Sequence, residues 1–211
     1  MSEQPLVEIS PPDKIPDVLP ILPLFDTVLF PKMVLPIIVA QKESIQLMDE
    51  AMAKDRIIGM LVSKNANPGS PVAAKDLYGV GTSALILKMA KMDDNKAQML
   101  VQGLDKFKIQ AFTGKKPYLQ ARIDHVQDEK LNIDKEVEAF TTNIGSLFTR
   151  LVELSPGLPP ELSAMAKTIP DAGDLANMVA SLIPAKFDEK QTVLEMNDVR
   201  KRLKEVTRLV N

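Results

Sequence analysis

Prolines crowded at the amino-terminal end are the feature that most limits how this chain can fold. Eight of the sixteen prolines lie within the first 36 residues. The stretch LPLFDTVLFPKMVLPI (22–37) is nearly all apolar, yet it holds three of these prolines, one Asp and one Lys. A membrane-spanning helix needs about 20 apolar residues in a row, and proline breaks helices. This stretch is therefore predicted to form strands and a connection, and we expect no membrane partner.

The first residues also argue against export. Residues 1–16 contain four prolines and charges of both signs. They lack the basic start and short apolar run of a secretory signal peptide, and they lack the Arg-rich character of a mitochondrial presequence. We expect a disordered, proline-rich leader over 1–16 and a cytoplasmic protein.

Composition removes several kinds of chemistry. The chain has no cysteine, which excludes disulfides, thiol nucleophiles and thiolate metal sites. Its only histidine, His125, lies in an alternating strand pattern (RIDHV), where we expect a surface or edge position. The 26 basic and 28 acidic residues nearly balance, whereas nucleic-acid-binding surfaces carry excess positive charge. We predict no catalytic residue, no metal or cofactor site, and no nucleic-acid partner.

Residues 17–130 are predicted to form one β-rich unit with a single helix. VLPILPL (18–24) predicts a strand that its prolines confine to an edge or a bulge. Lys106 and Lys108 alternate with Phe107 and Ile109, the period of two of a half-buried strand. The other expected strands are 34–40, 57–63, the arms of a long hairpin at 78–92 and 97–112, and 118–128, with a helix around 45–52. Their order suggests a closed or partly closed barrel.

Residues 131–211 are predicted to form a packed bundle of helices. Apolar residues at helical spacing mark a first helix over 134–154. Further helices are expected from 159, over 172–183 with Asp171 as N-cap, over about 187–195, and from an Asn197 N-cap to the end. The last helix carries no glycine or proline stop signal, so we expect the natural chain to continue beyond Asn211.

Six apolar residues are candidates for a binding surface. Phe25, Leu29, Phe30 and Met33 fall in a proline-bounded connection, and Met89 and Met92 lie toward the hairpin tip. They could fill the core or the interface between the two units. Alternatively, they could form an adaptable apolar patch that binds extended or unfolded polypeptide, since large exposed apolar patches generally mark interaction sites.

Several segments resemble one protein family. The segments are LPILPLFDTVLFPKMVLPIIVAQKESIQLMDEA (19–51), LYGVGTSALILKM (77–89), MLVQGLDKFKI (99–109), PPELSAMAKTIPD (159–171), LANMVASLIP (175–184) and EKQTVLEMNDVRKRL (189–203). In this order they resemble the N-terminal domain of Lon, the ATP-dependent bacterial protease. One departure is Phe25, which stands where the family commonly has Arg and so enlarges the local apolar surface.

The resemblance implies an α+β fold, a PUA-like β pseudo-barrel with one helix followed by an α-helical subdomain. It implies a non-catalytic domain that recognises unfolded or damaged protein substrates and assembles with neighbouring subunits. ATP and magnesium are then expected only in the ATPase module that follows this region in the family. The alternative from another class is a stand-alone PUA-like module that binds a small ligand or RNA, although balanced charge and few aromatics disfavour RNA.

Overall fold

The computed structural model describes residues 14–65, 72–93, 96–114 and 116–211. The expected leader over 1–16 lies almost wholly outside this part. The elements in chain order are β1 (Val18–Leu24), β2 (Val34–Val39), α1 (Lys42–Met52), β3 (Ile57–Val62), the 3-10 helix η1 (Ala74–Asp76), β4 (Val80–Asp93), β5 (Lys96–Gly114), β6 (Gln120–Val126), α2 (Lys135–Leu154), α3 (Glu161–Thr168), α4 (Ala172–Leu182), α5 (Phe187–Glu195) and α6 (Val199–Val210). The predicted α+β class is confirmed, with every expected strand and helix in order.

Five of the six strands close into a ring. The strands β5, β4, β3, β1 and β6 pair in that order, and β6 pairs back onto β5. Only β1 and β3 run parallel to each other. Strand β2 lies outside the ring and pairs with β5 alone. It is therefore the one strand of the described sheet with a free edge.

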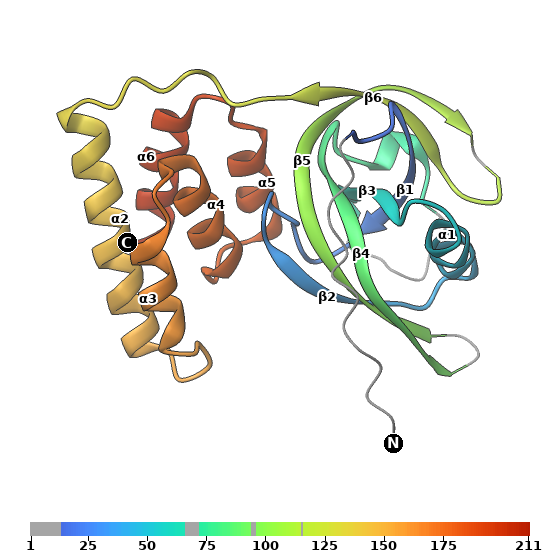
Figure 1. Cartoon of the computed structure of the whole chain (residues 1–211), viewed down its shortest axis with the longest axis horizontal. Coiled ribbons are helices and arrows are strands. Elements are labelled where there is room, and N and C mark those ends of the chain that lie inside the picture. The colour runs from blue at the N-terminus through green and yellow to red at the C-terminus, as the bar shows by residue number, and fades with distance from the viewer. Residues whose placement is uncertain (1–13, 66–71, 94–95, 115) are drawn as a thin grey trace.

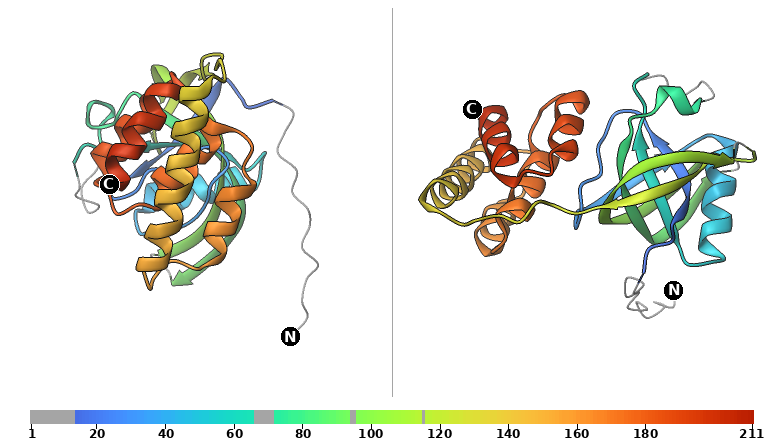
Figure 2. Two further views of the ribbon diagram at one scale, coloured as in Figure 1. Left: turned by 90° about the vertical axis from the view of Figure 1, so that its left-hand side faces the viewer. Right: turned by 90° about the horizontal axis from the view of Figure 1, so that it is seen from above.

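The helices lie to one side of this ring. Figure 1 shows α2 to α6 at the left and the ring with α1 at the right, and Figure 2 shows α2 on the side that faces away from the ring. One cluster of buried apolar side chains includes both strand and helix residues, so the two parts share a continuous core. Within the described residues, no helix is long and apolar enough to cross a membrane.

Strand β1 is one of the strands that form the ring and has a neighbour on each side, so the prediction that its prolines confine it to an edge or bulge is wrong. It pairs with β6 over Val18–Pro20 and with β3 over Ile21–Leu24. Ile21 donates its N–H toward β6, to the carbonyl of Leu119, and amides alternate in direction along a strand. Pro20 therefore faces β3 before that ladder begins, and Pro23 faces β6 after that ladder has ended. Neither proline removes a ladder hydrogen bond.

Aspartate side chains cap the starts of α2, α4 and α6, and the sequence predicted a cap for the last two of these helices. Asp171 accepts a hydrogen bond from the Asp174 amide and caps α4, as predicted. The cap of α6 is Asp198, whose side chain accepts from the Lys201 amide, so the prediction of Asn197 is wrong by one residue. Asn197 instead accepts a hydrogen bond from a buried lysine at the junction of the two parts.

The connection from β1 to β2 ends in a tight turn over residues 30–33. The Met33 amide donates to the Phe30 carbonyl at 3.3 Å, Pro31 is the second residue, and Lys32 has a φ of 64°. Proline followed by a positive φ is typical of a type II turn. The Lys32 amide donates to the Gly103 carbonyl at 2.9 Å, and the Gly103 amide donates to the Met33 carbonyl at 2.8 Å. Two residues here face one residue of β5, as in a β-bulge.

Lys32 occupies a backbone conformation that favours glycine, and its side chain forms an ion pair of 2.5 Å with Asp174 at the start of α4. Lys32→Ala should lose this ion pair and keep the backbone strain, whereas Lys32→Gly should lose the pair and relieve the strain. The left-handed conformation costs an L-residue about 1 kcal/mol. We expect Lys32→Gly to exceed Lys32→Ala in free energy of unfolding by about that amount, measured by urea denaturation. Equal stability of the two variants would contradict the assignment of strain.

Candidate functional site

The six predicted binding residues are not gathered on one surface. Leu29 and Phe30 are 2% and 0% exposed and lie in the core, so neither belongs to an exposed patch. Met33 and Met89 are half-buried and pack against the same core. Met92, near the hairpin tip, is 58% exposed.

Phe25 is half-buried and lines an apolar groove of about 470 Å³. One wall is the segment after β1, and the other is β2 with the start of α1. The lining residues are Pro23, Leu24, Phe25, Asp26, Thr27, Leu35, Pro36, Ile37, Ile38, Val39, Ala40, Gln41 and Ser44. The aromatic ring that stands where the resembling family has Arg therefore lies at a concave apolar surface.

The outer face of β2 supplies the main exposed apolar side chains beside this groove. Val34 is 52% exposed and Ile38 is 61% exposed, and Pro36 between them is also exposed. Ile37 and Val39 point the other way and are buried. Sequence reasoning missed this face because VLPIIVA is apolar at every position and shows no alternation. Pro36 was the available signal, since proline inside a sheet is confined to edge strands.

No charge interrupts this surface along β2. From Met33 to Gln41 the chain carries no Asp, Glu, Lys or Arg. Edge strands of soluble proteins are commonly protected by charged side chains, above all lysine. Strand β2 has no charged side chain, and Pro36 is its only residue of a type that protects edge strands. Such an apolar, uncharged edge is a surface suited to contact with another polypeptide.

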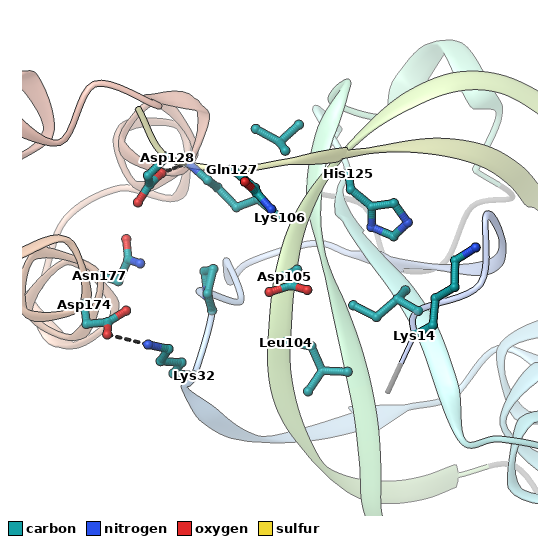
Figure 3. A pocket seen from close by; sticks show the side chains of 13 residues that line it. Lys14, Lys32, Leu104, Asp105, Lys106, His125, Gln127, Asp128, Asp174 and Asn177 are labelled. Atoms are coloured by element: carbon teal, nitrogen blue, oxygen red, sulfur yellow. Dashed lines mark hydrogen bonds and ion pairs between the residues drawn. The ribbon is translucent and has the colours of Figure 1, made fainter. Parts of the chain in front are cut away.

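A second, polar pocket of about 430 Å³ lies where the ring meets the helices. Figure 3 shows Lys32 and Asp174 facing each other across it, with Lys106 and Asp128 paired above them. His125 lines the same pocket, and its Nε2 lies 3.6 Å from Asp17 Oδ1. Its side chain is 39% exposed, which agrees with the expected surface position.

Lys106 and Arg202 meet at one carboxylate at this junction. Lys106 Nζ donates to Asp128 Oδ1 at 2.7 Å, to the Met196 carbonyl at 3.0 Å and to Asn197 Oδ1 at 3.0 Å. Arg202 binds both carboxylate oxygens of Asp128, with Nη1 2.9 Å from Oδ2. Lys106 is 5% exposed and Arg202 is 0% exposed. The cluster joins β5, the segment after β6 and α6.

The pKa values in this cluster follow from burial and charge. Burial acts to raise the pKa of Asp128, but hydrogen bonds from Arg202 and Lys106 outweigh it and hold that pKa below its usual range. Burial, followed by repulsion from Arg202, lowers the pKa of Lys106. Lys106 points away from Phe107, as the alternation predicts, but the helices cover it. Sequence alone could not reveal this, because the partners come from distant segments.

The chemistry of both surfaces is that of contact and packing. Every polar group of the Lys106–Asp128–Arg202 cluster that is described above has a partner inside the protein. Among the described residues, no group of three His, Asp or Glu side chains is placed to hold a metal ion. The apolar groove beside β2 is therefore the better candidate for binding another molecule.

Comparison with known proteins places this arrangement in a family. Residues 18–211 match the model of the ATP-dependent protease La (LON) substrate-binding domain. The chain is 45% identical over its whole length to the Lon protease of Syntrophus aciditrophicus (strain SB), and it covers 27% of that protein. It is 39% identical over 94% of its length to Lon protease 2 of Myxococcus xanthus, of which it covers 24%. The chain thus spans about a quarter of these relatives.

A solved structure shares the fold. The N-terminal domain of the Mycobacterium avium complex Lon protease superposes with a TM-score of 0.73 at 20% identity, covering 92% of this chain and 97% of that one. The Lon N-terminal domain protein from Xanthomonas campestris gives a TM-score of 0.64 at 16% identity, over 90% of this chain and 96% of its own. The family model and the curated relatives together show that this chain belongs to the Lon substrate-binding domain family.

Proposed function

We propose that this chain is a non-catalytic substrate-recognition domain that binds unfolded or damaged polypeptides in the groove beside β2. The observation that carries the proposal is the uncharged apolar strip of Val34, Pro36 and Ile38 on β2, of which Pro36 and Ile38 line the groove. An unfolded chain exposes apolar side chains that a folded protein buries, so such a strip distinguishes the two. Membership in the substrate-binding family supports the same reading.

Affinity for any one sequence should be modest. Groove and strip offer few charged or hydrogen-bonding side chains, and adaptable apolar contacts discriminate weakly between partners. Low selectivity suits a domain that captures damaged proteins of many kinds. We further propose that the chain acts in the cytoplasm, within a homo-oligomer of a longer Lon-type protease whose ATPase and protease modules perform the chemistry.

Two finer assignments belong to the same proposal. The ring of five strands is proposed to be a PUA-like pseudo-barrel, and residues 17–130 and 131–211 are proposed to be separate subdomains. The boundary falls between β6 and α2, where the buried cluster around Asp128 ties the two parts together. RNA binding is not favoured, because the groove beside β2 offers no basic side chain.

Ile38→Asp tests the proposed surface directly. The substitution places a charge on a side chain that is 61% exposed, so the fold should be retained. Full burial of one such apolar side chain against a partner contributes roughly 1.5–3 kcal/mol, so affinity for an unfolded protein should fall about tenfold or more. The measurement is fluorescence anisotropy of labelled, reduced and carboxymethylated lactalbumin titrated with the chain.

Met165→Asp is the matched control, because Met165 is 54% exposed on α3 in the helical part. It introduces the same charge at a similar exposure, away from β2. We expect its affinity to equal that of the unaltered chain. Equal affinity of the Ile38 variant as well would count against the groove beside β2.

A further inference from the structure

The backbone of β2 has hydrogen-bonding groups on its outer edge as well as toward β5. The Gly103 amide donates to the Met33 carbonyl, so the polar backbone groups of Met33 face β5. These groups alternate in direction along a strand. With Val34 opposite Gln102 and Val39 opposite Ala97, residues 35, 37 and 39 bond to β5. The backbone groups of Val34, Pro36 and Ile38 therefore point away from the sheet.

Nothing in the described part of the chain pairs with that outer edge. Strand β2 has β5 as its only strand partner, and no backbone hydrogen bond joins Val34 or Ile38 to the segment across the groove. The edge presents the carbonyls of Val34, Pro36 and Ile38 and the amides of Val34 and Ile38. Pro36 has no amide hydrogen to present, and its place on this side leaves the β2–β5 ladder complete.

We propose that a bound polypeptide adds to this edge as an extended strand, next to β2 and within the groove. The proposal rests on the proposed function and names its binding mode. Val34, Pro36 and Ile38 turn their backbone groups outward and also expose their side chains. A single added strand can therefore contact both the backbone groups and the side chains of these residues. An added strand gains main-chain hydrogen bonds at alternate residues and apolar contacts with Val34 and Ile38.

The occupant is defined by its chemistry. It is an uncharged segment with apolar side chains at alternate positions, in extended conformation. The occupant's lack of charge matches the stretch from Met33 to Gln41, where a charged side chain would lose water without meeting an opposite charge on β2. Asp26, which is exposed on the facing wall, is the one charged residue among those that line the groove. Main-chain hydrogen bonds are common to all sequences, which explains how one edge could accept many unfolded proteins.

The test uses short fluorescent peptides of alternating valine and threonine, titrated into the 211-residue chain. One peptide is unmodified, and two others carry N-methyl groups on the amides of one edge or of the opposite edge. N-methylation removes the donor and blocks close approach of a neighbouring strand. We expect at least one methylated peptide to bind about tenfold more weakly, the loss of one or two net hydrogen bonds. Binding of both within twofold would overturn the strand addition.

Two protein variants separate this inference from the proposed function. Ile38→Pro removes the outward amide without touching the β5 ladder, and Ile38→Ala removes the same side chain but keeps the amide. Ile38→Pro should bind the unmodified peptide about fivefold more weakly than Ile38→Ala, with equal unfolding midpoints. Equal binding by the two variants would overturn the pairing.

Ile38→Asp then distinguishes the two kinds of failure. If Ile38→Asp loses binding while the unaltered chain binds methylated and unmethylated peptides equally, strand addition is rejected. Side-chain binding in the groove would then remain supported. Unchanged binding of every peptide in this variant would reject the proposed function at this site, and strand addition with it. We expect Ile38→Asp to lose binding and the unaltered chain to bind at least one methylated peptide more weakly.

Discussion

Asp128→Asn is expected to lower the free energy of unfolding by about 3 kcal/mol, because removal of one partner leaves the other charges buried and unpaired. Arg202 and Lys106 are 0% and 5% exposed, and both direct hydrogen bonds at the Asp128 carboxylate. Asparagine keeps the shape of the side chain but has no negative charge. Urea denaturation followed by circular dichroism measures the change, with the slope as a check on two-state unfolding.

Asp49→Asn is the matched control for this substitution. Asp49 pairs with Lys91 at 2.9 Å, but the two side chains are 45% and 60% exposed. Exposed ion pairs contribute about 0–1 kcal/mol, so the control should change stability little. Equal losses in the two variants would show that burial does not decide the strength of the junction cluster.

The pH dependence of stability provides a second readout of Asp128. Hydrogen bonds from Arg202 and Lys106 hold its pKa below the ordinary value despite burial. A lowered pKa in the folded state contributes stability that is fully present above the ordinary carboxyl pKa of about 4 and is lost as pH falls through the folded pKa. The unaltered chain should therefore lose more stability on acidification than Asp128→Asn does. Parallel pH profiles would contradict this role.

Gly103→Ala is expected to have the other large effect, a loss of about 3 kcal/mol or failure to fold. A methyl group at this position would lie 2.2 Å from the Phe30 carbonyl oxygen, which is backbone and cannot rotate away. Overpacking of this kind commonly costs 1–3 kcal/mol and occasionally more. The turn over 30–33 and the start of β2 would have to shift, so peptide binding at β2 should weaken in any folded fraction. Thermal unfolding and the peptide titration measure the two effects.

Gly79→Ala is the control, since a methyl group there would have no atom within 4 Å. Both glycines belong to the β-rich part, and the glycines of the described residues have no positive φ. The control should leave stability unchanged or slightly raised, as alanine restricts the unfolded chain more than glycine does. A loss in Gly79→Ala as large as that in Gly103→Ala would rule out the close contact as the cause.

Local patterns in the sequence were sufficient for the elements themselves. The alternation of β5, the helical stripe of α2 and the Asp171 cap each depend on residues a few positions apart, so the sequence displays them directly. The resemblance to the Lon family also came from segments in the right order, and the family match over 18–211 confirms it.

Long-range pairing determined which residues are available for binding. Leu29 and Phe30 are as apolar as Val34 and Ile38, so residue type does not separate the buried pair from the exposed pair. The connection that carries Leu29 and Phe30 is fixed to the ring, where Thr82 Oγ1 donates to the Leu29 carbonyl at 2.6 Å. Buried position follows from contacts with β4 and β5, which no pattern within 25–33 encodes.

Long-range pairing also determined which strand has a free edge and which strand face is covered. Prolines in the sequence predicted edge or bulged strands. Strand β1 is nevertheless part of the ring, because its pairings with β6 and β3 are staggered along the strand. Strand β2 lies at the edge because only β5 pairs with it. Lys106 became buried because the helices cover one face of β5. The alternation of apolar and polar residues along a strand can be read from the sequence. Which edge of the strand stays unpaired, and which face is exposed to solvent, depends on the neighbouring segments. At LPLFDTVLFPKMVLPI, residue chemistry predicted the strands and the connection, and the packing of distant segments selected β2 as the exposed surface.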